Sequence, residues 1–115
     1  MPKNYTRKQR VSDVIQTALA EILQRNADDL KLGMVTVTSV DVARDLSFAK
    51  VFVSVLDDEK AVDVIKGLNS AAKFLRYELA NQIEIRTTPE LRFVYDDSSV
   101  RGHRITSLIN DALKK

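Results

Sequence analysis

Residues 61–83 read AVDVIKGLNSAAKFLRYELANQI, a sequence that is helical in composition but interrupted near its middle. Gly67 is a weak helix former, and Asn69 and Ser70 are residues that favour the start of a new helix. Beyond the interruption, apolar residues recur at near-helical spacing: Ala71, Ala72, Leu75, Leu79 and Ile83. This segment therefore predicts two helices that meet at a kink.

Two strands are predicted before this helical pair. Residues 34–42 are rich in Val and Thr, and residues 49–55 alternate apolar and polar side chains. The short connection between them predicts an antiparallel hairpin. Within the first strand the alternation changes phase, because Val35 and Val37 share one parity and the later valines share the other. The change predicts a β-bulge near Ser39.

A third strand and two further helices complete the predicted order. Pro89 favours extended backbone before it, and residues 91–95 alternate as a strand. Residues 10–26 carry one apolar stripe at helical spacing. A last helix is predicted from the apolar residues Ile105, Leu108, Ile109, Ala112 and Leu113. The order is α-β-β-α-kink-α-β with a C-terminal helix, which predicts an α+β fold with a three-stranded sheet and its helices on one face.

Residues 1–115 are expected to form a single domain, with flexible ends at about 1–6 and 114–115. The order strand, helix, helix, strand is the core of a KH module, which clamps about four nucleotides through the turn between its helices. Neither residues 67–70 nor residues 70–73 match the GXXG loop that marks this turn. The order of elements favours a KH-like fold, whereas the missing loop argues against the ordinary KH mode of RNA binding.

The composition argues against catalysis. The chain has no Cys and one His, and it contains no glycine-rich phosphate loop and no spaced set of metal ligands. We expect His103 to be a surface residue and the acids at 57–59 to favour the start of a helix rather than hold a metal. No enzyme activity, cofactor or metal is therefore predicted. Residues 1–10 lack the apolar core of a secretory signal, and a cytoplasmic protein is expected.

The formal net charge is only +2, but the charges are segregated along the chain. Segregation of this kind can give a small protein a positive face that attracts phosphate. The basic residues that we take as candidate RNA-binding residues are Lys3, Arg7, Lys8 and Arg10 near the start, Lys66, Lys73 and Arg76 beside the kink, and Arg101, His103 and Arg104 near the end. The alternative, that these are solvated tails and a solvated helix face, stays open.

Several motifs, in one order along nearly the whole chain, resemble the ribosome-binding factor A family. They are RKQRV at 7–11, LGM at 32–34, SV at 39–40, RDL at 44–46, AKV at 49–51, AAKFLR at 71–76 and PELRFVYD at 89–96. The resemblance implies a type II KH-like domain whose interhelical loop is replaced by a kink with an Ala-x-Gly pattern. That pattern falls on Ala71, Ala72 and Lys73, so that a lysine stands at the glycine position.

The resemblance also implies the partners and the role. Members bind the free 30S ribosomal subunit, contact its 16S rRNA and assist late maturation, including processing near the 5′ end of the rRNA, and they matter most in the cold. We expect a monomer with no membrane partner and no small-molecule substrate. The kink candidates are Gly67, Asn69, Ser70, Ala71, Ala72 and Lys73.

Two other interpretations remain beside a ribosomal role. A generic KH-type RNA-binding protein would bind short single strands equally well on or off the subunit. A protein-interaction module would assemble through an exposed strand edge or helix face, with little dependence on salt. An enzyme ranks after both.

Overall fold

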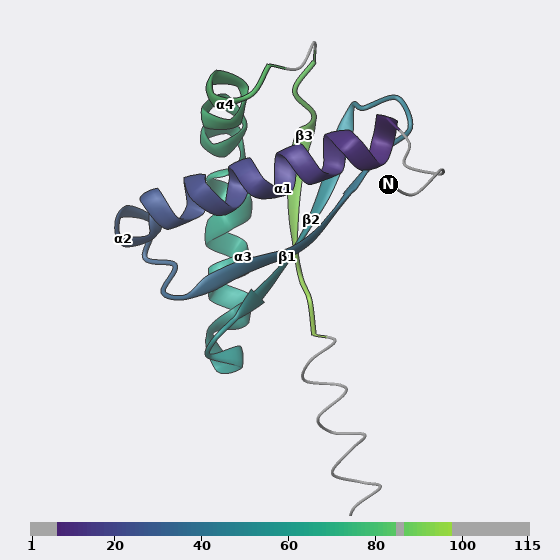
Figure 1. Cartoon of the computed structure of the whole chain (residues 1–115). Helices are drawn as coiled ribbons and strands as arrows, with labels where there is room; N and C mark the ends of the chain where they lie inside the picture. Colours follow the sequence, from purple (N-terminus) through teal and green to yellow (C-terminus); the bar gives the residue numbers. More distant parts are fainter. Residues whose placement is uncertain (1–6, 85–86, 98–115) are drawn as a thin grey trace, which may run out of the picture.

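A computed structural model of the chain describes residues 7–84 and 87–97. Its elements are α1 (Arg7–Arg25), α2 (Ala27–Leu30), β1 (Val35–Val42), β2 (Phe48–Val55), the 3-10 turn η1 (Asp58–Lys60), α3 (Ala61–Ser70), α4 (Ala72–Gln82) and β3 (Glu90–Tyr95). The predicted order is confirmed over this part of the chain (Figure 1). The short α2 and η1 were not predicted. The predicted C-terminal helix and the predicted flexible ends lie outside the described residues.

The three strands form one sheet in the order β1-β2-β3. The strands β1 and β2 are antiparallel, as the predicted hairpin requires, and β3 is parallel to β2. A parallel neighbour needs a crossover connection, which α3 and α4 provide. The helical pair of residues 61–83 therefore sets the topology, because it carries the chain from the end of β2 back to the start of β3.

A β-bulge interrupts β1 where the sequence predicts it. The pairing with β2 shifts between Val37 and Ser39, which leaves Thr38 as the additional residue. The hydroxyl of Thr38 lies 3.2 Å from the Phe52 carbonyl oxygen and 2.6 Å from Oδ2 of Asp96. The bulge corrects the phase of the strand, since Val37 and Val42 can then both be buried although their positions differ in parity.

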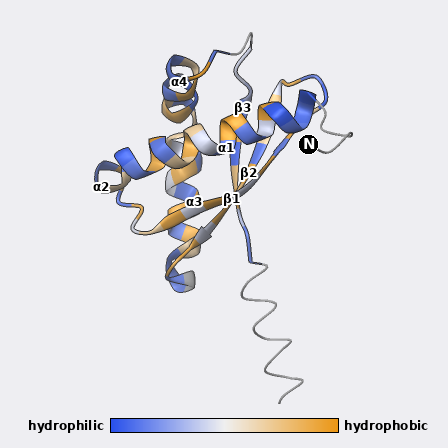
Figure 2. Cartoon of the chain, viewed as in Figure 1, coloured by the Kyte–Doolittle hydropathy of each residue, from blue (hydrophilic) through white to orange (hydrophobic). Residues whose placement is uncertain are grey.

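One face of the sheet carries the core. The helix α1 packs on β1 and against α4, while α3 and α4 pack on β3 (Figure 1). The buried strand residues are Val37, Val42, Ala49, Val51, Val53, Leu91 and Phe93. The fully buried helix residues Ile15, Leu19, Ile22, Leu68, Leu75 and Leu79 meet them. Figure 2 shows hydrophobic colour on both the strands and the helices, interrupted on each by hydrophilic residues. The predicted layer of helices on one face of the sheet is confirmed.

The break between α3 and α4 falls at Ala71, later than the predicted interruption at residues 67–70. Gly67 lies inside the last turns of α3, and Ser70 ends that helix. The N–H of Ala71 lies 3.0 Å from the Gly67 carbonyl oxygen, and its own carbonyl oxygen accepts the N–H of Leu75 at 2.9 Å. Hydrogen bonding thus continues through the break, so the connection is a kink and contains no loop.

The prediction that Asn69 or Ser70 caps the second helix is wrong. The N-cap position of α4 is Ala71, and both predicted caps lie in α3. The side chain of Asn69 bonds to β3 instead. Its Nδ2 donates to the Phe93 carbonyl oxygen at 3.0 Å, and its Oδ1 accepts the Phe93 N–H at 2.8 Å. The strand β3 has β2 on one side only, so this backbone would otherwise face outward from the edge of the sheet. Asn69 therefore fastens the kinked helical pair to the strand edge.

We expect Asn69→Ala to lower the free energy of unfolding by about 1–3 kcal/mol, since it leaves a half-buried donor and acceptor of Phe93 without partners. Urea denaturation measures the change. Asn81→Ala is the matched control, because Asn81 is an exposed asparagine of α4 and the helix-propensity change is the same. Equal unfolding midpoints for the two variants would contradict a stabilising role for the Asn69 contact.

Candidate nucleic-acid interface

The first turn of α1 is strongly basic. It contains Arg7, Lys8 and Arg10 and no acidic residue. The N-terminal end of a helix carries a partial positive charge, so cations at this end cost stability, typically about 0.3–1 kcal/mol each. Figure 2 shows this end of α1, and the neighbouring β1–β2 turn, in hydrophilic colour. These cations do not stabilise the start of the helix, which is consistent with a role in binding a partner.

The β1–β2 turn beside it is held in one conformation by its own hydrogen bonds. The N–H of Leu46 lies 2.9 Å from the Ala43 carbonyl oxygen, and Leu46 has a left-handed backbone with φ of 62°. Oδ1 of Asp45 accepts the N–H of Ser47 at 3.1 Å and its hydroxyl at 2.7 Å. These two bonds from Ser47 hold the pKa of Asp45 below its usual range. Arg44, exposed in the middle of this turn, therefore extends from an ordered backbone.

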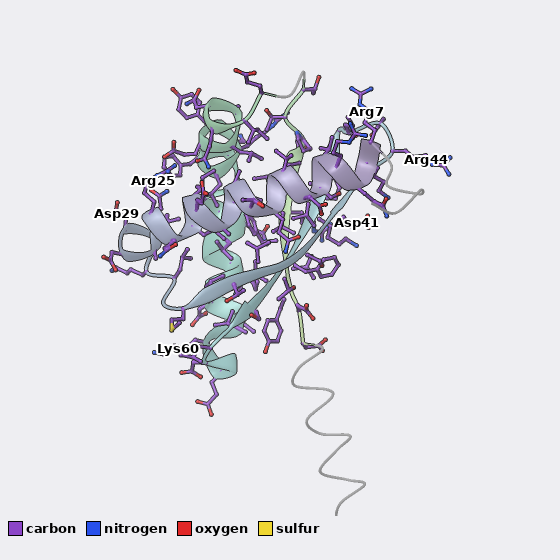
Figure 3. The ribbon with its side chains drawn as sticks, in the orientation of Figure 1. Arg7, Arg25, Asp29, Asp41, Arg44 and Lys60 are labelled. Atoms are coloured by element: carbon purple, nitrogen blue, oxygen red, sulfur yellow. The ribbon has the colours of Figure 1, made fainter. Side chains whose placement is uncertain are left out.

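These two elements, together with Glu84 and Thr87 from the segment between α4 and β3, surround a hollow of about 730 Å³. Its cationic side chains are Arg7 and Arg10 from α1 and Arg44 from the turn, and we call it the arginine hollow. Figure 3 shows Arg7 and Arg44 at the same end of the molecule, remote from Arg25 and Lys60. Three permanent positive charges from two elements can bind phosphate groups that lie along one surface.

The apolar and acidic side chains of the arginine hollow complete its lining. Val11, Val14 and Leu46 supply the apolar part, and Asp45 and Glu84 supply two carboxylates. Val14 is 43% exposed although it lies beside the core positions of α1. The hollow therefore combines cations, acceptors and an uncovered apolar area.

Lys8 differs from the two arginines of its turn. Its Nζ lies 3.3 Å from Oδ1 of Asp41 on β1, and both side chains are well exposed, at 46% and 65%. An exposed pair of this kind contributes about 0–1 kcal/mol and is weakened by salt. Lys8 therefore extends toward β1, with its charge partly neutralised, and does not line the arginine hollow.

The basic residues beside the kink divide into two groups. Lys66 and Lys73 are exposed, in agreement with a surface role. Nε and Nη2 of Arg76 instead donate to the Thr88 carbonyl oxygen at 3.1 and 2.8 Å. This guanidinium fixes the segment that leads into β3, so we assign Arg76 to the fold and leave it out of the proposed interface.

Four of the sequence-predicted candidates, Lys3, Arg101, His103 and Arg104, lie outside the described residues. Arg44 was not predicted as an RNA-binding residue; in the sequence it stands out only as part of the RDL motif at 44–46. Its position in a predicted hairpin turn indicates that Arg44 is exposed. The residues next to it in the sequence do not indicate which other cations the folded turn will lie beside.

Residues 7–84 and 87–97 contain neither a metal-binding cluster nor a membrane-spanning helix. No group of three or more His, Cys, Asp or Glu side chains in these ranges is placed to hold a metal ion. Over the same ranges, no helix combines the length and the apolar character needed to cross a bilayer.

Comparison with known proteins places the chain in one family. A sequence model described as ribosome-binding factor A matches residues 7–109. The ribosome-binding factor A of Pseudomonas syringae pv. tomato is 44% identical, over 98% of this chain and 84% of the relative. That of Cellvibrio japonicus is 45% identical, over 98% and 85%.

Solved structures give the same answer for the fold. The crystal structure of ribosome-binding factor A from Thermus thermophilus has a TM-score of 0.68 and 28% identity, covering 78% of this chain and 97% of that one. The solution structure of a Thermotoga maritima protein described as a putative member has a TM-score of 0.70 and 29% identity, covering 85% and 94%. A homology model of the Thermus thermophilus protein, fitted into a cryo-electron-microscopy map of a complex with the 30S subunit, has a TM-score of 0.61 and 30% identity, covering 74% of this chain and 90% of that one.

The family match spans most of the chain, and the matching structures share its α+β architecture and the KH-like fold. On this evidence the chain belongs to the ribosome-binding factor A family.

Proposed function

We propose that this protein binds the free 30S subunit through its 16S rRNA and assists late maturation of the subunit, including processing near the 5′ end of the rRNA. It acts in the cytoplasm as a monomer, by binding alone, with no cofactor and no small-molecule substrate. Family membership supports the ribosomal role, and one relative is described in a complex with the 30S subunit. The observation that carries the RNA contact is the convergence of Arg7, Arg10 and Arg44 on one hollow.

The chemistry of these groups fits RNA backbone. Guanidinium groups donate two parallel hydrogen bonds to a phosphate, and they stay charged at any physiological pH. The exposed Lys66 and Lys73 form a second, smaller basic site beside the kink and extend the same interface in this proposal. Phosphate contacts position a protein on RNA, but they carry no sequence information by themselves.

The proposed mechanism requires binding only and involves no chemical step. A rigid protein that binds one local conformation of a maturing rRNA more tightly than its competitors shifts the RNA toward that conformation. The size of the shift equals the difference in affinity, so a tenfold preference corresponds to about 1.4 kcal/mol. Processing enzymes would then act on the favoured conformation.

Co-sedimentation of the purified protein with 30S subunits at several salt concentrations tests the proposal. If the three arginines each neutralise one phosphate, the dissociation constant should rise at least about 20-fold between about 50 and 200 mM salt, and contacts from Lys66 and Lys73 would increase this factor. Magnesium is kept constant so that the subunits stay intact. A salt-independent dissociation constant would contradict an interface built on arginine and phosphate.

Two further arms separate the alternatives. A generic RNA-binding KH protein would bind an unrelated short single strand as tightly as it binds the subunit. A protein-interaction module would keep its partner after nuclease treatment and at high salt. Loss of binding after nuclease treatment, with a preference for the subunit, is the outcome that we expect.

A further inference from the structure

We propose that the arginine hollow holds one unpaired nucleotide of RNA, with its phosphate groups on the arginines and its base on the apolar side chains. The inference rests on the proposed function and names the ligand class of one part of that interface. A volume of about 730 Å³ lies within the roughly 300–1,000 Å³ that small-ligand sites occupy. A site that bound only a regular phosphate backbone would need no hollow.

The apolar side chains argue for a base. Val11, Val14 and Leu46 line the same hollow as the arginines, and the exposed Val14 is not needed to complete the core. The two flat faces of a base are apolar and pack well on aliphatic side chains, whereas phosphate and ribose gain little there. A paired base in a duplex is stacked between its neighbours and cannot enter, so the nucleotide must be unpaired.

The two carboxylates argue against a simple anion site. Asp45 and Glu84 would repel a free phosphate, yet both line the hollow. A nucleotide carries donors that a phosphate lacks, namely the ribose hydroxyls and the amino groups of some bases, and carboxylates accept from such donors. Oδ1 of Asp45 already accepts two hydrogen bonds from Ser47, which fix the carboxylate in place. Three cations and two acceptors together therefore match a nucleotide better than they match its phosphate alone.

Methyl NMR of the full chain tests the base contact directly. Adenosine monophosphate should shift the methyl signals of Val11, Val14 and Leu46 through the ring current of the base, whereas ribose 5-phosphate should leave them nearly unmoved. A short single-stranded RNA should reproduce the adenosine pattern at lower concentration, and a fully paired RNA should not. Equal methyl shifts from adenosine monophosphate and ribose 5-phosphate would overturn the proposal.

Val14→Asn provides the mutational arm. The two residues have similar helix propensities, and loss of the apolar contact should weaken binding of the single-stranded RNA about fivefold. The matched control is Val62→Asn, which alters another exposed helix valine, 66% exposed, that does not line the hollow. We expect Val62→Asn to leave RNA affinity unchanged. An equal effect of the two substitutions would contradict the assignment.

Binding to 30S subunits is measured in parallel, so that the two proposals can fail separately. Salt-dependent subunit binding without methyl shifts from the base would reject the nucleotide site and leave the proposed function standing. Methyl shifts from adenosine monophosphate without subunit binding would reject the proposed function and retain the nucleotide site.

Discussion

Replacing Arg7, Arg10 and Arg44 together with alanine is expected to weaken binding to the 30S subunit roughly 100-fold. The estimate takes about 1 kcal/mol for each exposed arginine–phosphate contact, which is less than a buried charged hydrogen bond contributes. The three side chains come from α1 and from the β1–β2 turn, and they line one hollow. Co-sedimentation with 30S subunits at constant salt measures the loss.

The same variant should not be less stable than the wild type. Arg7 and Arg10 oppose the partial positive charge at the start of α1, and alanine is a better helix former. Its thermal midpoint should therefore stay equal or rise while its binding falls. A loss of affinity together with a lower midpoint would instead indicate partial unfolding.

A charge-matched control removes three cations elsewhere. Arg25→Ala, Lys31→Gly and Lys60→Ala together change the net charge by the same amount, and none of these three residues lines the hollow. Figure 3 shows Arg25 and Lys60 far from Arg7 and Arg44. Glycine is used at position 31 because Lys31 has a left-handed backbone with φ of 54°, which alanine would keep only with strain. We expect this control to weaken binding no more than about threefold, through the loss of general attraction. An equal loss in both variants would show that net charge matters and the hollow does not.

Phe93→Ala is expected to produce the largest loss of stability, about 3–5 kcal/mol, because it removes a large buried side chain and leaves a cavity. Phe93 is 2% exposed on β3, in the sheet register opposite Val51, and its backbone is the part that Asn69 binds. A domain of this size has a total stability of about 5–15 kcal/mol, so the variant should unfold at a much lower urea concentration. Chemical denaturation followed by circular dichroism measures the change.

Phe74→Ala is the matched control, since this phenylalanine of α4 is 45% exposed and lies outside the buried core. Its loss should be less than about 1.5 kcal/mol, because little buried area is removed. Similar losses for the two variants would contradict the position of Phe93 at the centre of the core.

Local sequence patterns determined most of the fold over the described residues. The bulge near Ser39 follows from a change of parity within one strand, and the kinked helical pair follows from one interruption in residues 61–83. Both patterns involve residues that are close together in the sequence, where backbone preference and side-chain alternation determine the local structure. The break itself lies at Ala71 and not at residues 67–70, because packing of the helices on β3 overrides the weak helix propensity of Gly67.

The partners of individual polar side chains were decided only by the tertiary structure. Asn69 could cap a helix or bind a strand edge, and Arg76 could face RNA or the Thr88 carbonyl, with no difference in local sequence. Arg44 is a single cation in a turn until the hairpin brings it beside Arg7 and Arg10. The role of each of these side chains depends on residues that are distant in the sequence, so a short segment of sequence cannot predict it. The sequence therefore indicated the family, the main helices and strands, and two of the three arginines, while folding decided which cations share one hollow.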